Sequence, residues 1–189
     1  MVWLIFQRGY MNLPTYYDRF SQILHWVMAT IIIYATIAGY VMHLVINNYP
    51  VVFYVLSIIN MSLATIGTLL FIIRWFWSYF RPAIKEVDHK SAIEANVAGF
   101  MHALLYFLMF VVFVSGFLML EHPYTFFWLF DVNNVVENLA INQFFFMIHR
   151  AGCALLGLSV IIHVAAACHH HFIRKNRLLD RMTKYKEQS

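Results

Sequence analysis

Four long apolar runs dominate this chain of 189 residues, of which only 12% are charged. Ordinary soluble domains carry about 25% charged residues, so this composition indicates an integral membrane protein. Each run is long enough to cross a hydrocarbon core of about 30 Å as a single helix. The expected fold is therefore an all-α, four-helix transmembrane bundle. We place its spans at Ile23–Ile46, Val51–Phe76, Ala98–Leu120 and Ile141–Cys168.

The bundle is expected to form one domain, residues 23–168, between an N-terminal segment, 1–22, and a basic tail, 169–189. The first two spans are joined by only a few polar residues, so they must be antiparallel neighbours. The first ten residues lack the charged and apolar regions of a signal peptide and have no clear structural role. This favours Met11 as the natural start of the protein.

The distribution of Lys and Arg predicts the orientation of the spans. The first and third connections contain neither residue, whereas the other polar segments are basic. By the positive-inside rule, both termini and the second connection are cytoplasmic. The formal charge of +4 thus reflects topology and indicates no nucleic-acid partner. The third connection is acidic, and its aromatic YTFFWLF patch is expected to anchor it in the outer interface, with partner docking as the alternative.

Two histidines, His149 and His163, lie fourteen residues apart in the fourth span. Fourteen helical residues return to nearly the same face about 21 Å further along the axis. Imidazole is costly in hydrocarbon, so each histidine should have a partner or a function. The spacing suits two metal centres stacked across the membrane.

Since the spans alternate in direction, residues at equal depth can be matched between them. The matching gives two layers. The inner layer contains His25, Arg74, His102 and His163, and the outer layer contains Gly39, Asn60, Gly116 and His149. A haem iron takes one imidazole on each side of the porphyrin, and a guanidinium would pair with its propionates. Outer-layer glycines would let a flat macrocycle approach the backbone closely.

Simpler interpretations exist for each of these residues. A membrane histidine can be a hydrogen-bonded packing residue, Arg74 can extend its side chain to the headgroups, and glycines can serve helix contacts. Zinc is a poorer candidate than haem, because no carboxylate or thiolate joins these histidines at a suitable spacing.

Several motifs resemble those of the bacterial cytochrome b561 family, four-helix membrane proteins that bind haem b. The resemblance runs from about Tyr17 to Met182. It rests on YDRFSQILHW (17–26), FIIRWFW (71–77), AGFMHALLYFLMF (98–110) and the two fourth-span histidines followed by VAAACHHHF (164–172).

The resemblance implies two haems, each with one ligand from the fourth helix. His163 would pair with His25 on the inner haem, and His149 would pair with a second-span histidine on the outer haem. It also implies electron transfer across the bacterial inner membrane to ubiquinone, from a donor that in some relatives is superoxide. His170 matches a position near the inner quinone site. Alternatively, His169 to His171 form a polar cluster at a helix end.

A second hypothesis is that the protein is a non-catalytic cytochrome b subunit, which docks a partner redox enzyme and accepts its electrons. The chain contains no partner domain of its own, and this is compatible with either reading.

The chain departs from the family pattern in its second span, which reads SIINMSLATIG and contains no histidine. Asn60 stands where the outer ligand is expected, His43 lies too far out to replace it, and Met61 points about 100° away. Three outcomes remain open: a five-coordinate haem on His149, an unusual sixth ligand, or no outer haem and a hydrogen bond between His149 and Asn60. We favour a retained haem, and a five-coordinate iron would be open to superoxide, oxygen or nitric oxide.

Overall fold

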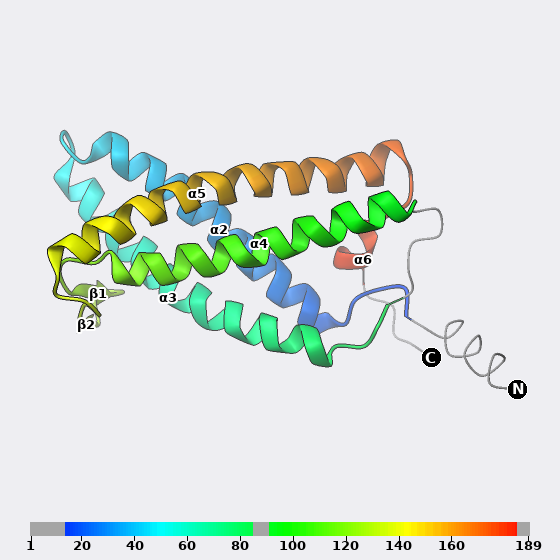
Figure 1. The fold of residues 1–189 in the computed structure, drawn as a ribbon, viewed down its shortest axis with the longest axis horizontal. Helices are drawn as coiled ribbons and strands as arrows, with labels where there is room; N and C mark the ends of the chain where they lie inside the picture. The colour runs from blue at the N-terminus through cyan, green and yellow to red at the C-terminus, as the bar shows by residue number, and fades with distance from the viewer. Residues whose placement is uncertain (1–13, 85–90, 185–189) are drawn as a thin grey trace, which may run out of the picture.

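The structure, a computed structural model, describes residues 14–84 and 91–184. Four of its helices are long and apolar enough to cross a membrane, which confirms the four predicted spans. The expectation that Met11 is the natural start falls outside the described residues, as do the side chains of Lys85, Lys90 and Lys186. The long helices are α2 (Arg19–Val45), α3 (Pro50–Phe80), α4 (Ala92–Leu118) and α5 (Leu139–Cys168), the last extended by a π-helix, His169–Ile173 (Figure 1).

Polar caps explain why the helices begin before the apolar runs do. The Asp18 side chain accepts from the first turn of α2, Ser91 does the same for α4, and Asn138 does so for α5. These side chains satisfy backbone N–H groups that have no partner within the helix. As a result α4 begins at Ala92 rather than at Ala98, where hydropathy alone placed it.

The bundle is built from two helix pairs. Helix α2 packs along α3, and α4 packs along α5, whereas contacts between the two pairs are fewer. One place where the pairs meet is the level of Gly67. There, a methyl group added at Gly67 of α3 would lie 3.2 Å from Ile31 of α2 and 3.3 Å from Phe113 of α4. The buried core at this level contains Met28, Phe71, Leu108, Met109, Phe113 and Leu156.

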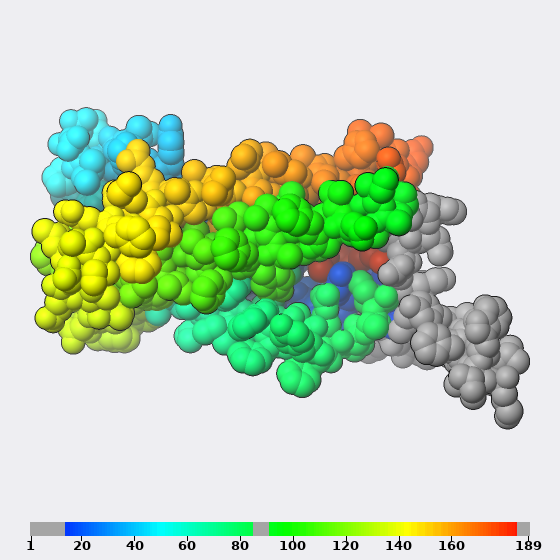
Figure 2. Space-filling model, viewed as in Figure 1, coloured from blue at the N-terminus to red at the C-terminus, as the bar shows by residue number. Residues whose placement is uncertain are grey.

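The two ends of the bundle differ. One end, here the α6 end, holds the start of α2, the end of α3, the start of α4 and the short helix α6 (Asp180–Thr183) (Figure 1). The other, here the hairpin end, holds the loop between α4 and α5. Towards the α6 end, α3 and α4 separate, and a recess between them exposes α2 and the C-terminal segment (Figure 2).

A small β-hairpin in the loop adds an element that the all-α prediction did not include. Strand β1 (Tyr124–Phe126) pairs antiparallel with β2 (Phe130–Val132), and Phe126 lies opposite Phe130. Strands of three residues are too short to leave a clear alternating pattern in the sequence. The observed fold is therefore mostly helical with one two-stranded sheet among the described residues.

The hairpin is fixed to α3 by two hydrogen bonds. The Phe127 N–H donates to Oγ of the fully buried Ser62 at 2.8 Å, and the hydroxyls of Thr65 and Tyr124 lie 2.7 Å apart. Phe127 and its neighbour Trp128 have φ values of 41° and 60°, in the left-handed region that aromatic residues rarely adopt. The bond to Ser62 helps to hold this strained turn.

The C-terminal segment folds back onto the start of α2. The Gln22 side-chain nitrogen lies 3.2 Å from the Arg181 carbonyl and 2.9 Å from that of Lys184, and also contacts the Tyr17 carbonyl at 3.1 Å. The Trp26 indole N–H donates to the Met182 carbonyl at 2.9 Å. This segment therefore closes the α6 end of the bundle.

Candidate cofactor-binding site

The inner layer is centred on Arg74 of α3. Its Nη2 donates to Nδ1 of His25 on α2 at 3.2 Å, and its Nε donates to the hydroxyl of Tyr106 on α4 at 3.1 Å. The side chain is half-buried, and among the described residues no carboxylate lies within ion-pair distance of it. A guanidinium removed from water is stable only when it is paired or fully hydrogen-bonded, so this position calls for an anion.

The other two inner-layer histidines contact each other on the second helix pair. The rings of His102 on α4 and His163 on α5 have centroids 5.4 Å apart at an interplanar angle of 62°. Arg74 connects the two groups, because it contacts His25 and also Tyr106, which lies one helical turn after His102. The structure thus brings together all four residues that the sequence assigned to this layer.

These residues fit a haem. His25 and His163 stand on different helix pairs, which is the arrangement needed for one imidazole on each side of a porphyrin. A ligating histidine keeps its proton on the other ring nitrogen, so His25 would carry that proton on Nδ1 if it held iron through Nε2. Arg74 could then no longer donate to that nitrogen and would be free for a propionate. Both the donors and the missing anion therefore match the cofactor.

In the outer layer, His149 of α5 is held against α4. Its Nδ1 lies 3.0 Å from the Val112 carbonyl and 3.3 Å from Oγ of Ser115, while its Nε2 lies 3.4 Å from Sγ of Cys153. A Cβ at Gly116 would lie 3.1 Å from the ring carbon Cε1. A side chain at position 116 would press on the ring, so the glycine allows the close approach of His149.

The surroundings of Asn60 and Gly39 differ from those expected of a ligand pocket. The Oδ1 atom of Asn60 is buried and has no hydrogen-bond partner, so the bond to His149 considered above is not formed at this atom. Gly39 is exposed, and a Cβ there would have nothing within 4 Å. His43 is exposed too.

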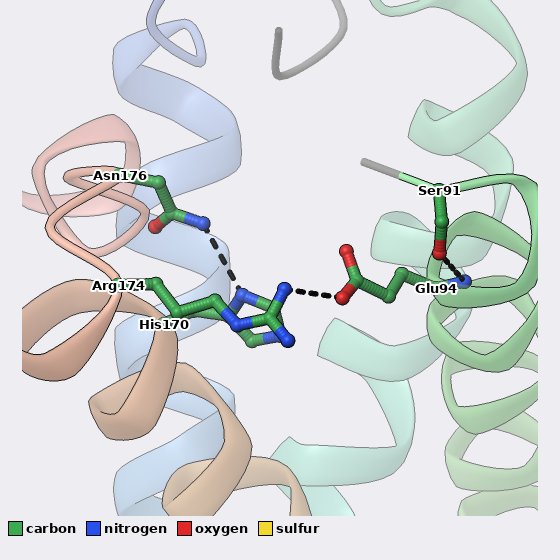
Figure 3. A network of polar contacts seen from close by, with 5 residues as sticks. All are labelled: Ser91, Glu94, His170, Arg174 and Asn176. Atoms are coloured by element: carbon green, nitrogen blue, oxygen red, sulfur yellow. Dashed lines mark hydrogen bonds and ion pairs between the residues drawn. The ribbon is translucent and has the colours of Figure 1, made fainter. Parts of the chain in front are cut away.

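A polar network surrounds His170 at the α6 end (Figure 3). Nδ2 of Asn176 lies 3.2 Å from Nδ1 of His170, within the turn that follows the π-helix. Arg174 forms an ion pair with Glu94 of α4, whose backbone N–H is capped by Ser91 (Figure 3). The network therefore joins the start of α4 and the end of α5 beside His170, the histidine that the family resemblance linked to quinone.

Three residues of these layers were missed by sequence reasoning. Tyr106 and Cys153 each follow a layer histidine by four positions, which places them on the same helix face, so the spacing was an available signal. Ser115 precedes Gly116 and hydrogen-bonds to its own helix at Val111 as well as contacting His149. A Ser in a helix often bonds to its own backbone, so nothing in the sequence marks Ser115.

Two comparisons with known proteins show which family this chain resembles. The family model described as prokaryotic cytochrome b561 matches residues 16–185. A relative from Escherichia coli strain K12, described as cytochrome b561 homolog 2, is 26% identical over 183 residues. The alignment covers 92% of this chain and 94% of the relative.

Proposed function

Because the chain belongs to the prokaryotic cytochrome b561 family, we propose that it carries electrons from a donor at the outer face to ubiquinone at the cytoplasmic face. Family membership makes it a membrane haem protein that transfers electrons across the membrane. In this proposal the α6 end, with its basic residues, faces the cytoplasm of a bacterial cell and the hairpin end lies outside. Both termini are then cytoplasmic.

The observation that carries the proposal is the environment of Arg74. A half-buried guanidinium lies between His25 and Tyr106 without a carboxylate among the described residues. Haem propionates would supply the missing negative charge in a bidentate geometry that suits arginine. If Arg74 only extended its side chain to the lipid headgroups, no histidine would be needed at this depth on either helix pair.

We assign the inner ligands to His25 and His163. His102 contacts the ring of His163 and would fix its orientation, while Tyr106 holds Arg74 towards the cofactor. A bound haem supplies the one-electron chemistry of its iron, which protein side chains lack. The protein contributes position, the charge of Arg74 and exclusion of water, all of which influence the reduction potential.

At the α6 end, His170 is proposed to contact the quinone. Quinone reduction takes up protons as well as electrons, and imidazole is a suitable donor near neutral pH. Asn176 contacts Nδ1 of His170, so Nε2 is the nitrogen left for a ligand. The donor at the outer face is superoxide or a redox protein, and the proposal holds for either.

Visible spectroscopy of the purified protein with pyridine-haem quantitation tests this assignment. His25→Ala or His163→Ala should abolish the six-coordinate low-spin spectrum of the inner haem. His43→Ala is a matched control, because this exposed histidine of the same helix as His25 lies outside both layers, and it should leave the spectrum unchanged. Absence of haem from the wild-type protein, or a normal spectrum in both ligand variants, would refute the proposal. Electron transfer only with a co-purifying enzyme would identify the chain as a subunit.

A further inference from the structure

The hydrogen bonds of His149 determine which of its nitrogens carries the proton. A carbonyl can only accept, so the contact of 3.0 Å with Val112 requires N–H on Nδ1. The neutral ring then has its lone pair on Nε2, facing Cys153. Metal-ligating histidines use this arrangement, with one nitrogen donating to a backbone carbonyl and the other directed to the metal. His149 is therefore oriented as a ligand by its own helix pair.

The packing around His149 also fixes the ring. Gly116 lets the ring lie against α4, since even a methyl group there would approach Cε1 to 3.1 Å. Gly152, one turn along α5, brings the two helices together in the same way, because its Cβ would lie 3.1 Å from Val112. Among the described residues, Nε2 contacts the thiol of Cys153, a weak donor on a side chain with one rotatable bond. Displacing that thiol would cost little.

The pair formed by α2 and α3 offers no equivalent ligand in the outer layer. Helix α3 contains no histidine, and Asn60 holds the position that lies fourteen residues before Arg74. Its amide oxygen is buried without a hydrogen-bond partner, which is unusual enough to require an explanation. Because an amide can be turned by 180°, the same position can present its NH2 donors instead. Asn60 is thus a weak ligand but a good hydrogen-bond partner for a small molecule.

We propose that the outer layer holds a haem through His149 alone, and that the remaining coordination position binds small neutral diatomic molecules such as carbon monoxide, nitric oxide or oxygen. Asn60 is the side chain that hydrogen-bonds the bound molecule. This inference rests on the proposed function, since it concerns a second centre of the same cytochrome. In the proposed assignment the inner haem would not bind them, because His25 and His163 would hold both of its coordination positions.

Carbon monoxide is a direct probe, because it binds reduced iron with an open position and leaves bis-histidine haems unchanged. The wild-type protein in detergent, reduced with dithionite, should contain two haems per chain and show a carbon monoxide difference spectrum from one of them. One haem per chain, or two low-spin haems with no response, would overturn the proposal. Loss of all haem would instead refute the proposed function, so the two failures are distinguishable.

Two variants of the same residue locate the site. Asn60→His supplies the missing ligand, so the outer iron should become low-spin and the carbon monoxide response should be lost. Asn60→Leu removes only the amide, so the response should remain while the C–O stretching frequency shifts to a value typical of an apolar pocket. A stretching frequency unchanged in Asn60→Leu would overturn the assignment of Asn60.

His149→Ala removes the proposed ligand of the outer haem. The carbon monoxide response should disappear and the haem content should fall from two to one per chain, while the low-spin inner spectrum stays. A response that survives this change would show that another residue holds the outer iron, and the proposal would be wrong.

Discussion

Replacing Gln22 by Ala should release the C-terminal segment from the bundle. Its NH2 group has two hydrogens and lies within 3.2 Å of three carbonyl oxygens, those of Tyr17, Arg181 and Lys184. Two full hydrogen bonds are therefore available, and each contributes about 0.5–1.5 kcal/mol net. The loss is then about 1–3 kcal/mol, which corresponds to an increase of about 5- to 150-fold in the open population.

Limited trypsin digestion in detergent measures this opening, because Arg177 and Arg181 lie in the segment. When the segment recloses faster than it is cut, the cleavage rate is proportional to the open population. Trp26→Phe removes one hydrogen bond, to the Met182 carbonyl, which costs about 1 kcal/mol. The cleavage rate should therefore rise by about 5-fold. Gln143→Ala is the matched control, since this exposed glutamine lies at the hairpin end.

Equal cleavage rates in Gln22→Ala, Gln143→Ala and the wild-type protein would refute the reasoning. The segment would then be held by contacts other than the Gln22 amide. The result also bears on the inner layer, because Met182 lines a small cavity together with Arg74 and Tyr106. Release of the segment should open this cavity to solvent.

Three further changes probe the hairpin, the helix contact and the charge of the inner layer. Ser62→Ala leaves the Phe127 N–H without its acceptor, costs about 1–3 kcal/mol and should speed hydrogen exchange in the hairpin; unchanged exchange would contradict this. Gly152→Val overpacks the contact with Val112 and should lower the free energy of unfolding by about 1–3 kcal/mol. The thermal midpoint should fall accordingly, and an equal or higher midpoint would argue against the close contact. Arg74→Gln removes a positive charge that favours reduced iron, so potentiometric titration should give a lower inner-haem potential, and a raised potential would contradict the assignment.

The sequence predicted the helices and the inner layer because both follow from periodicity. Apolar length located four spans, and spacing alone placed Arg74 level with His25, which it contacts at 3.2 Å. The same counting placed His102 with His163, and their rings do meet. Depth in a helical bundle is a one-dimensional quantity, so residue number is enough to estimate it.

Other features depend on contacts that residue number does not encode. The proton position on His149 is set by a backbone carbonyl of α4, and every residue type carries such a carbonyl. Gly39 and Gly116 looked equivalent by depth, yet one is exposed and the other lies beneath a histidine ring. The hairpin turn places Phe127 and Trp128 in a conformation that local propensity disfavours, so only tertiary contacts explain it.

The division of the bundle into two helix pairs has a consequence for how the protein is made. Each pair is continuous in sequence, so α2 with α3 and α4 with α5 can each insert into the membrane as one unit during synthesis. The units then meet through a short core, and a cofactor ligated by His25 and His163 would bridge them. Because a ligand that binds only the folded state stabilises that state, haem supply should control how much assembled protein survives quality control in the cell. Haem availability would thus limit the amount of assembled protein before any electron is transferred.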